Sequence, residues 1–472
     1  MPSIKKVRDL IKRNSKALNI LILCLVGYYF IIFNPFSTLG KQKPEVTHYF
    51  LPKSLNAESP LYKPTTADFF KNKNSDLDLR SLMDLEFPYD PLSSTPKFIW
   101  QTHKNNPDTD PNFREDHKLY MKSDARMPLD SPQNGLKYSD PKNNEWIYYY
   151  LTDEDVNHFV ETTFADLEPI VWAFKTLPTG ILKADFFRYL IIYARGGIYS
   201  DVDTTLMKSL PDWAGNNYKF IEELVKDSKD RFVYSGPATS EEMPPAYDML
   251  NTPGLVVGIE ADADRPDWAQ YFARRVQLCQ WTIQAKPGHP VLRELILNIT
   301  STTLASSTLV SSSIKSRIKF DEDHLHEYKI QNRNTRFPSN DQKHAKNVDG
   351  TDIMNWTGPG IFTDTIYEYL EYLINNYKHV NIFNKNLNIQ HHEGDDDSKK
   401  STQKFKTRIT ESFQKLRIDW GFYSLMQRPI LLSDIAILPI TAFSPDVGHM
   451  GAKSSNSEDC YVKHYFSGSW KG

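Results

Sequence analysis

Two aspartates separated by one residue, Asp201 and Asp203, follow a short β-rich run and carry the most specific chemistry in the sequence. Side chains alternate along a strand, so these two carboxylates point to the same side. Two like charges this close are costly unless a positive charge lies between them. Carboxylate oxygens suit Mg²⁺ or Mn²⁺, which can also ligate a diphosphate. The pair predicts a metal site; the alternative is a solvated loop, where most isolated Asp-x-Asp pairs lie.

The residues before this pair predict a helix that ends at two glycines. Apolar side chains recur at helical spacing and predict one apolar stripe, formed by Leu182, Phe186, Tyr189, Leu190 and Tyr193. Gly196 and Gly197 end the helix, because a left-handed C-terminal cap favours glycine. A strand over residues 198–203 follows. Asp185 and Arg188 are i, i+3 on one helix face, so they either pair with each other or face a ligand together.

Lys183-x-Asp185-x-x-Arg188, followed by Gly-Gly-x-Tyr-x-Asp-x-Asp ending at Asp203, resembles the signature of glycosyltransferase family 32. The resemblance implies a GT-A fold, an α/β sheet that binds a nucleotide sugar. It also implies that Asp201 and Asp203 hold Mn²⁺ against the donor diphosphate. Asp185 and Arg188 would be catalytic with the two metal ligands, and together with Lys183 they would contact the donor.

The same resemblance implies further site residues at both ends of the catalytic region. His464 is a candidate third metal ligand, although a lone histidine is more often structural. Ser469 and Trp470 would contact the diphosphate. Near the start, the donor base and ribose would lie at three consecutive residues, Trp100, Gln101 and Thr102. Many family members have histidine at the position of Trp100.

The order of elements predicts an α/β fold with a mainly parallel sheet. Strands are expected at residues 96–102 and 146–151, followed by a helix capped by Thr152 and another helix at 167–176. In such sheets ligands lie at the carboxyl ends of the strands, so the first strand and the Asp-x-Asp pair should face one crevice.

Further elements are expected in the second half of the chain. The patterns predict strands at 232–236 and 255–259, helices at 268–278 and 290–297, and surface insertions at 301–316 and 393–400. An amphipathic helix follows residues 357–360, which form either a plain helix entry or, by the family resemblance, a loop near the sugar and acceptor.

The amino terminus predicts a membrane anchor. Residues 1–16 hold six basic residues and one acidic, and removing this +5 from the overall −3 leaves −8 for the remainder. Residues 17–36 form an apolar segment long enough to span a membrane, with a cleaved signal peptide as the alternative. Positive charge before the segment predicts a cytosolic tail, a stem at 37–90 and a lumenal GT-A domain at 91–472.

Composition narrows the remaining possibilities. A formal net charge of −3 provides no basic surface for nucleic acid. On the lumenal side Cys279 and Cys460 either form one disulfide or stay free. Asn298 and Asn355 stand in glycosylation tripeptides, whose use stays open.

Within family 32 the chain resembles fungal members at residues 254–262 and 281–289. This implies a Golgi type II membrane enzyme that moves mannose from GDP-mannose onto a Man8GlcNAc2-type N-glycan in α-1,6 linkage with retention. Two alternatives keep the fold. One is a paralogous subunit of a mannan-elongating Golgi complex, and the other is a non-catalytic scaffold.

Overall fold

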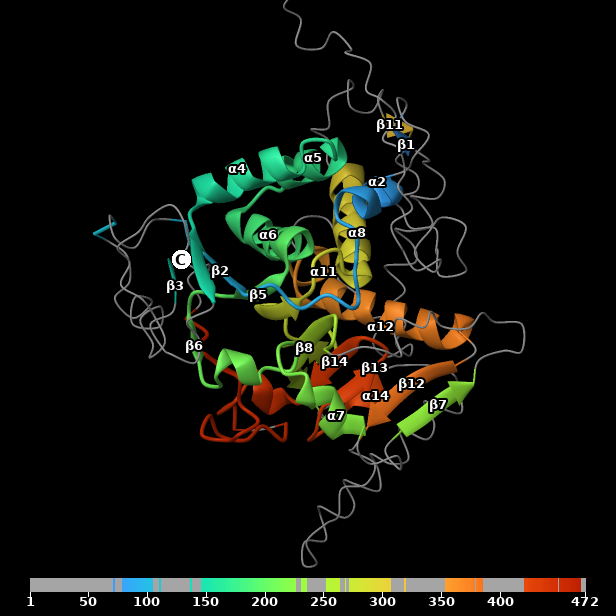
Figure 1. Cartoon of the computed structure of the whole chain (residues 1–472). Helices are drawn as coiled ribbons and strands as arrows, with labels where there is room; N and C mark the ends of the chain where they lie inside the picture. The colour runs from blue at the N-terminus through green and yellow to red at the C-terminus, as the bar shows by residue number, and fades with distance from the viewer. Residues whose placement is uncertain are drawn as a thin grey trace, which may run out of the picture. The chain divides into compact units, whose positions relative to one another are not determined.

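A computed structural model of the 472-residue chain is shown in Figure 1. The chain divides into two compact units, residues 1–49 and 50–472, and every described residue belongs to the second. The structure describes residues 71–72, 79–104, 110–111, 136–137, 146–225, 231–235, 252–263, 268, 271–306, 318–319, 353–377, 379–384, 420–448 and 450–467. In these ranges no helix combines the length and apolar character needed to cross a membrane. The predicted tail and anchor lie outside them.

One large mixed sheet organises the described residues (Figure 1). Its strands are, in spatial order, β3 (Leu136–Lys137), β4 (Ile147–Leu151), β2 (Phe98–Thr102), β5 (Gly197–Ser200), β10 (Thr282–Ala285), β8 (Leu255–Asp262), β14 (Ile435–Leu438), β13 (Ile430–Leu432), β12 (His379–Asn384) and β7 (Arg231–Ser235), with β9 (Val276–Leu278) paired to β8. Two smaller pairs are β1 (Lys71–Asn72) with β11 (Ile318–Lys319), and β6 (Thr204–Leu206) with β15 (Val462–His464).

The prediction of a mainly parallel sheet is correct for only part of it. Strand β2 is parallel to β4 and β5, and β8 is parallel to β14, whereas the other pairings are antiparallel. Because β10 is antiparallel to both β5 and β8, these last two strands run in the same direction. The carboxyl ends of β2, β4, β5, β8 and β14 therefore meet at one edge of the sheet, together with the start of β10.

Alternation along the strands divides the core into two layers. Val257 of β8 faces one cluster and Val256 the other, as period two requires. The larger cluster packs the sheet against α4 (Asp153–Thr163), α5 (Glu168–Thr176), α6 (Gly180–Arg195), α8 (Pro290–Ser306) and α12 (Pro359–Asn376). The second face lies against η3 (Leu210–Asp212), η9 (Ile440–Ala442) and part of α7 (Lys219–Val225).

Helix α6 is buried on nearly all sides, and not on one stripe as predicted. Ile191 and Ile192 are fully buried together with Tyr189, because α6 lies between the sheet and its neighbours α4, α5 and α8 (Figure 1). It ends as predicted at Gly196, whose φ is 65°. Gly197 has φ 96°, and a Cβ there would lie 2.5 Å from the carbonyl oxygen of Phe98, so only glycine fits.

The predicted stem boundary at residue 90 is wrong, because α2 (Leu79–Glu86) belongs to the folded core. Arg80 is 1% exposed and contacts Glu294 of α8 through two hydrogen bonds of 2.8 and 2.9 Å. Arg293 of α8 contacts the buried Asp84. The stem prediction failed here because the charged residues Arg80, Asp84 and Glu86 make this eight-residue helix look solvated unless their partners are known.

Other predictions need local correction. The helix expected at 268–278 is wrong, because residues 276–278 form strand β9. Helix α8 continues to Ser306, so residues 301–306 are helical and not part of an insertion; Ser301 and Thr303 bond back to carbonyls four residues earlier. The helix α12 is confirmed, after the short α11 (Ile353–Trp356). The insertion at 393–400 lies outside the described residues.

Two questions that the sequence left open are answered by burial. Cys279 and Cys460 are both buried and free, so they do not form a disulfide. Asn298 lies within α8 at 8% exposure, a position that a glycan cannot occupy in the folded chain. The side chain of Asn355 accepts a hydrogen bond from Arg274 at 2.9 Å.

We expect Arg80→Ala to lower the free energy of unfolding by about 3–5 kcal/mol, because it removes one partner from a buried ion pair. The matched control is Lys175→Ala, which removes an exposed pair with Glu161 and should leave the free energy of unfolding nearly unchanged. Urea denaturation of both variants measures the difference. Equal losses would show that the contact of α2 with α8 does not stabilise the folded core.

Candidate active site

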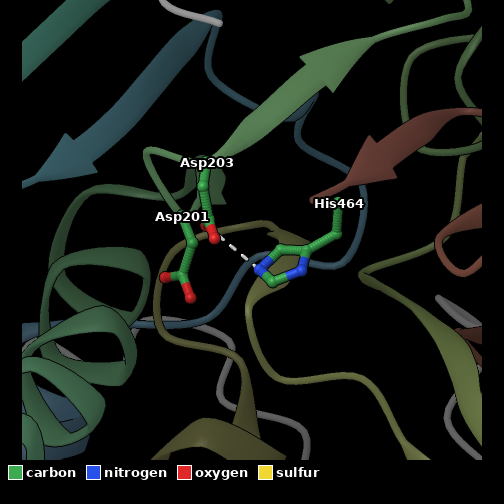
Figure 2. A group of neighbouring side chains, drawn as sticks. All are labelled: Asp201, Asp203 and His464. Atoms are coloured by element: carbon green, nitrogen blue, oxygen red, sulfur yellow. Dashed lines mark ion pairs between the residues drawn. The ribbon is translucent and has the colours of Figure 1, made fainter. Parts of the chain in front are cut away.

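Three side chains of types that can ligate a metal ion meet at the carboxyl edge of the sheet (Figure 2). Asp201 and Asp203 lie in the turn between β5 and β6, so the strand predicted over residues 198–203 is wrong beyond Ser200. His464 ends β15. One ligand atom from each lies within 4.8 Å of the others. The Nε2 atom of His464 lies 3.1 Å from Oδ1 of Asp203. Residues more than 250 positions apart in the chain thus lie in one cluster, the same three that the family resemblance implied as metal ligands.

The C-terminal strand holds this cluster together through its backbone. Strand β15 pairs with β6, with His464 opposite Thr204. The N–H of Ser467 donates to Oδ2 of Asp203 at 2.8 Å, and the N–H of Phe466 donates to Nδ1 of His464 at 2.9 Å. This last bond orients the ring so that Nε2 faces Asp203 (Figure 2).

The two aspartates have opposite pKa shifts. Burial raises the pKa of Asp201, and the neighbouring charge of Asp203 adds to this, although Arg188 counteracts both. Burial would also raise the pKa of Asp203, but hydrogen bonds from His464 and from the Ser467 N–H outweigh it and lower that pKa to about 2. Asp203 is therefore the carboxylate that stays ionised most firmly.

Arg188 supplies the positive charge that the aspartates require. Its guanidinium donates to Oδ1 of Asp185 at 2.6 Å and to Oδ1 of Asp201 at 3.2 Å. The group is 3% exposed and lies over the Tyr199 ring, 5.2 Å from its centroid. Burial would lower the pKa of Arg188, but Asp201 and Asp185 raise it, so the guanidinium stays charged. The predicted i, i+3 pair thus extends to the metal cluster.

Sequence reasoning missed the residues that complete this network. Gln280 contacts Arg188 through its Oε1 and donates to Oδ1 of Asp185 at 3.1 Å. Thr357 donates to the other oxygen of Asp185 at 3.2 Å, so the loop at 357–360 reaches the site from α12. The sequence signals for these residues were indirect. Gln280 directly precedes the stretch 281–289 that resembles fungal family members. Residues 357–360 were expected to form either a plain helix entry or a loop near the sugar and acceptor.

The three residues predicted to hold the donor base end strand β2 but have mainly structural contacts. Trp100 is 7% exposed, donates its indole N–H to the carbonyl of Gly196 at 2.9 Å and stacks on Tyr149 at 4.5 Å. Gln101 donates to the carbonyl of Asp201 at 2.8 Å, and thereby positions the metal loop, the turn over residues 201–203 between β5 and β6. Thr102 bonds to the Tyr199 hydroxyl at 3.1 Å. Their contact with a donor stays a prediction.

Lys183 and the last residues complete the predicted set. The ammonium of Lys183 lies 5.7 Å from the Phe174 ring on α5. Two residues along a helix rotate a side chain by about 200°, so Lys183 and Asp185 lie on opposite faces. The structure therefore does not bring Lys183 to the carboxylates. Ser469 and Trp470 lie outside the described residues.

The donor set fits a hard or borderline divalent cation. Two carboxylates and one imidazole are ligands that Mn²⁺ accepts, and Mg²⁺ favours the oxygens among them. Asp201 is the most accessible of the three, with its side chain 27% exposed. The cluster therefore has both the ligand chemistry for such an ion and an open side on which a diphosphate could complete the coordination.

Comparison with known proteins agrees with this chemistry. Residues 133–220 match the family described as a glycosyltransferase sugar-binding region containing a DXD motif. One solved structure, the PaToxG glycosyltransferase, aligns with a TM-score of 0.25 and 11% identity over 60% of this chain and 93% of that one, a likeness too low to assign a fold.

Three curated relatives have the name initiation-specific alpha-1,6-mannosyltransferase. The chain is 41% identical to the one from Saccharomyces cerevisiae, over 85% of this chain and 83% of the relative. It is 35% identical to the Candida albicans protein, over 95% and 92%. It is 34% identical to the Schizosaccharomyces pombe protein, over 82% and 66%.

We expect Asp203→Asn to weaken Mn²⁺ binding at least about tenfold, the smallest loss typical even of residues that only support a metal ligand. Calorimetric titration of the full chain with Mn²⁺ measures this directly. The matched control is Asp446→Asn, which removes an aspartate that pairs with Lys463 beside the same strand. Equal affinity in both variants would contradict the metal assignment.

We expect Arg188→Lys to lower the free energy of unfolding by about 1–3 kcal/mol, because a compact ammonium bonds to both aspartates less well than the planar guanidinium and leaves buried acceptors unsatisfied. The control is Arg195→Lys at the exposed end of the same helix, expected to change stability by less than about 0.5 kcal/mol. Thermal unfolding compares the two. A neutral Arg188→Lys would mean that the network does not stabilise the fold.

Proposed function

The chain belongs to the glycosyltransferases whose sugar-binding region contains a DXD motif and is a mannosyltransferase, and from this premise we propose that it transfers mannose from GDP-mannose to an N-linked core glycan in α-1,6 linkage. The observation that carries the proposal is the Asp201, Asp203 and His464 cluster at the carboxyl edge of the sheet. In α/β sheets this edge is where nucleotides bind. The linkage follows the names of the relatives, and the proposed acceptor is a Man8GlcNAc2-type glycan.

Asp201, Asp203 and His464 would hold the cation, for which we propose Mn²⁺. A bound cation supplies electrostatic stabilisation for the negative charge that develops on the leaving diphosphate. The protein keeps these ligands in place before the donor arrives: Gln101 holds the backbone of Asp201, and Ser467 holds the carboxylate of Asp203. Such preorganisation is what makes electrostatic catalysis effective.

Asp185 and Arg188 would orient the mannose relative to this centre. An α-linked product from an α-linked donor requires retention, either through a carboxylate nucleophile or through attack on the same face, in which the leaving phosphate takes the proton of the acceptor. Both oxygens of Asp185 are already bonded, one to Arg188 and Gln280 and the other to Thr357. This engagement makes Asp185 a poor nucleophile and favours same-face attack.

The proposed setting is the Golgi membrane, with the GT-A domain in the lumen. It rests on the basic residues before the apolar segment 17–36, which favour a cytosolic amino terminus. A short span suits the thinner membranes of the early secretory pathway. The proposed partners are the N-glycan acceptor, the membrane and a Golgi mannosyltransferase complex.

The test is transfer by the full chain, in detergent, from GDP-mannose to Man8GlcNAc2 with Mn²⁺ or with chelator. We expect one added mannose that an α-1,6-specific mannosidase removes, and no product with chelator. The variant that combines Asp201→Asn and Asp203→Asn should lose transfer entirely, because no carboxylate ligand remains for the cation.

Other outcomes separate the alternatives. Transfer only to longer mannans would support a mannan-elongating paralogue. A chain with neither transfer nor hydrolysis of GDP-mannose would overturn the enzymatic proposal. Full activity of the double variant would remove the metal from the mechanism.

A further inference from the structure

Glu260 lies near the carboxyl end of β8, at the sheet edge that holds the metal cluster. The pairing of β8 with β9 is irregular between Ile259 and Ala261, so simple alternation does not place Glu260. Its bond to Gln277 places it on the second face of the sheet, because the neighbours of Gln277 along β9 face the first core layer. Trp281, just before β10, lies in the second core layer. Strands β8 and β10 are direct neighbours, and the N–H of Asp201 donates to the carbonyl of Trp281 at 2.9 Å. Glu260 and Trp281 therefore flank the metal loop on one face.

The carboxylate of Glu260 is fixed in position. Nε2 of Gln277 donates to its Oε2 at 2.9 Å. The orientation of this amide is set by its other end, because Oε1 of Gln277 accepts from the N–H groups of Ala273 and Arg274 at 2.9 and 3.3 Å. Gln277 is 1% exposed and Glu260 is half-buried. The buried amide of Gln277 therefore fixes the partly accessible carboxylate of Glu260.

The indole N–H of Trp281 supplies a matching donor. Its Nε1 is buried and makes no hydrogen bond of good geometry among the described residues. Burial raises the pKa of Glu260, while hydrogen bonding from Gln277 and from the Trp281 indole and the nearby charges of His464 and Arg188 oppose the rise. The indole N–H therefore approaches the carboxylate of Glu260 but is not fully satisfied by it. A poorly satisfied buried donor is costly, which makes it a signal for a further partner.

An aromatic wall closes this corner. The Trp281 ring lies 4.4 Å from the His464 ring at an angle of 36°, and Phe466 packs edge-on against both rings. Phe466 is 53% exposed, with a φ of 49°, a region that a bulky residue seldom adopts. An acceptor, a poorly satisfied donor and an exposed aromatic ring thus meet beside His464, the candidate third metal ligand.

We propose that Glu260 and Trp281 form a subsite for one hydroxyl group of a pyranose, resting on the proposed mannosyltransferase function. A hydroxyl both donates and accepts, so it can donate to the carboxylate and accept from the indole N–H. The sugar is either the mannose of the donor or a mannose of the acceptor. Because a site built to bond a hydroxyl rejects the analogue that lacks it, the subsite determines specificity.

The test uses the full chain and two conservative variants, Glu260→Gln and Trp281→Phe. The first keeps an acceptor for Gln277, and the second keeps the ring against His464 and deletes only the N–H. Each is assayed for hydrolysis of GDP-mannose without acceptor and for transfer to the glycan. The KM values are then measured for GDP-mannose and glycan, and for analogues that lack single hydroxyls on either sugar.

A donor-sugar subsite predicts a rise of about tenfold or more in the KM for GDP-mannose in both assays. An acceptor subsite predicts unchanged hydrolysis and a similar rise in the KM for the glycan. In either case one deoxy analogue is as poor a substrate for the variants as the complete sugar, because the deleted hydroxyl has already lost its partners. Two controls, Glu154→Gln on the exposed first turn of α4 and Trp213→Phe, which removes the N–H bonded to Lys208, should leave both KM values unchanged.

Unchanged KM values for every substrate in folded Glu260→Gln and Trp281→Phe chains would overturn the subsite. So would equal discrimination against every deoxy analogue by the variants and the original chain. If the original chain neither hydrolyses nor transfers GDP-mannose, the proposed function fails instead, and the two failures are therefore distinguishable.

Discussion

The charge of one buried arginine makes the rest of this site possible. Arg188 bonds to Asp185 on its own helix and to Asp201 after the next strand, at a place where the guanidinium is 3% exposed. Without it, two carboxylates would be desolvated next to a third, Asp203, and burial alone would favour their neutral forms. A planar guanidinium with several donors can bond to both partners, which an ammonium cannot do as well.

This constraint explains the burial of α6 and the glycines that follow it. The helix can carry a charged pair through the core only because Gln280 and Thr357 satisfy the remaining atoms of Asp185. The chain must then reverse within two residues to bring Asp201 back toward Arg188. Gly196 and Gly197 permit that turn, since both have positive φ and a Cβ on Gly197 would lie 2.5 Å from a backbone oxygen.

The sequence predicted what depends on local spacing. The helix, the glycine stop, the aspartate pair and the i, i+3 pair of Asp185 and Arg188 all follow from residues within about one helical turn of each other. His464 could be proposed only through family resemblance, because nothing near it in the chain shows that β15 pairs with β6. Gln280, Glu260 and α2 were missed for the same reason. Their roles arise from the order of strands in the sheet, which local patterns do not encode.

The position of His464 has a consequence for how the site is assembled. The candidate metal site needs β15, and β15 is held to the molecule by β6 and by the bond from Ser467 to Asp203. Phe466 links the same segment to Trp281, which adjoins the backbone of Asp201. A sugar bound between Glu260 and Trp281 would therefore press on the aromatic contacts that position His464. Sugar binding at this subsite and the positioning of His464 would then favour the same conformation of the C-terminal segment. The two would be coupled through the rings of Trp281, Phe466 and His464.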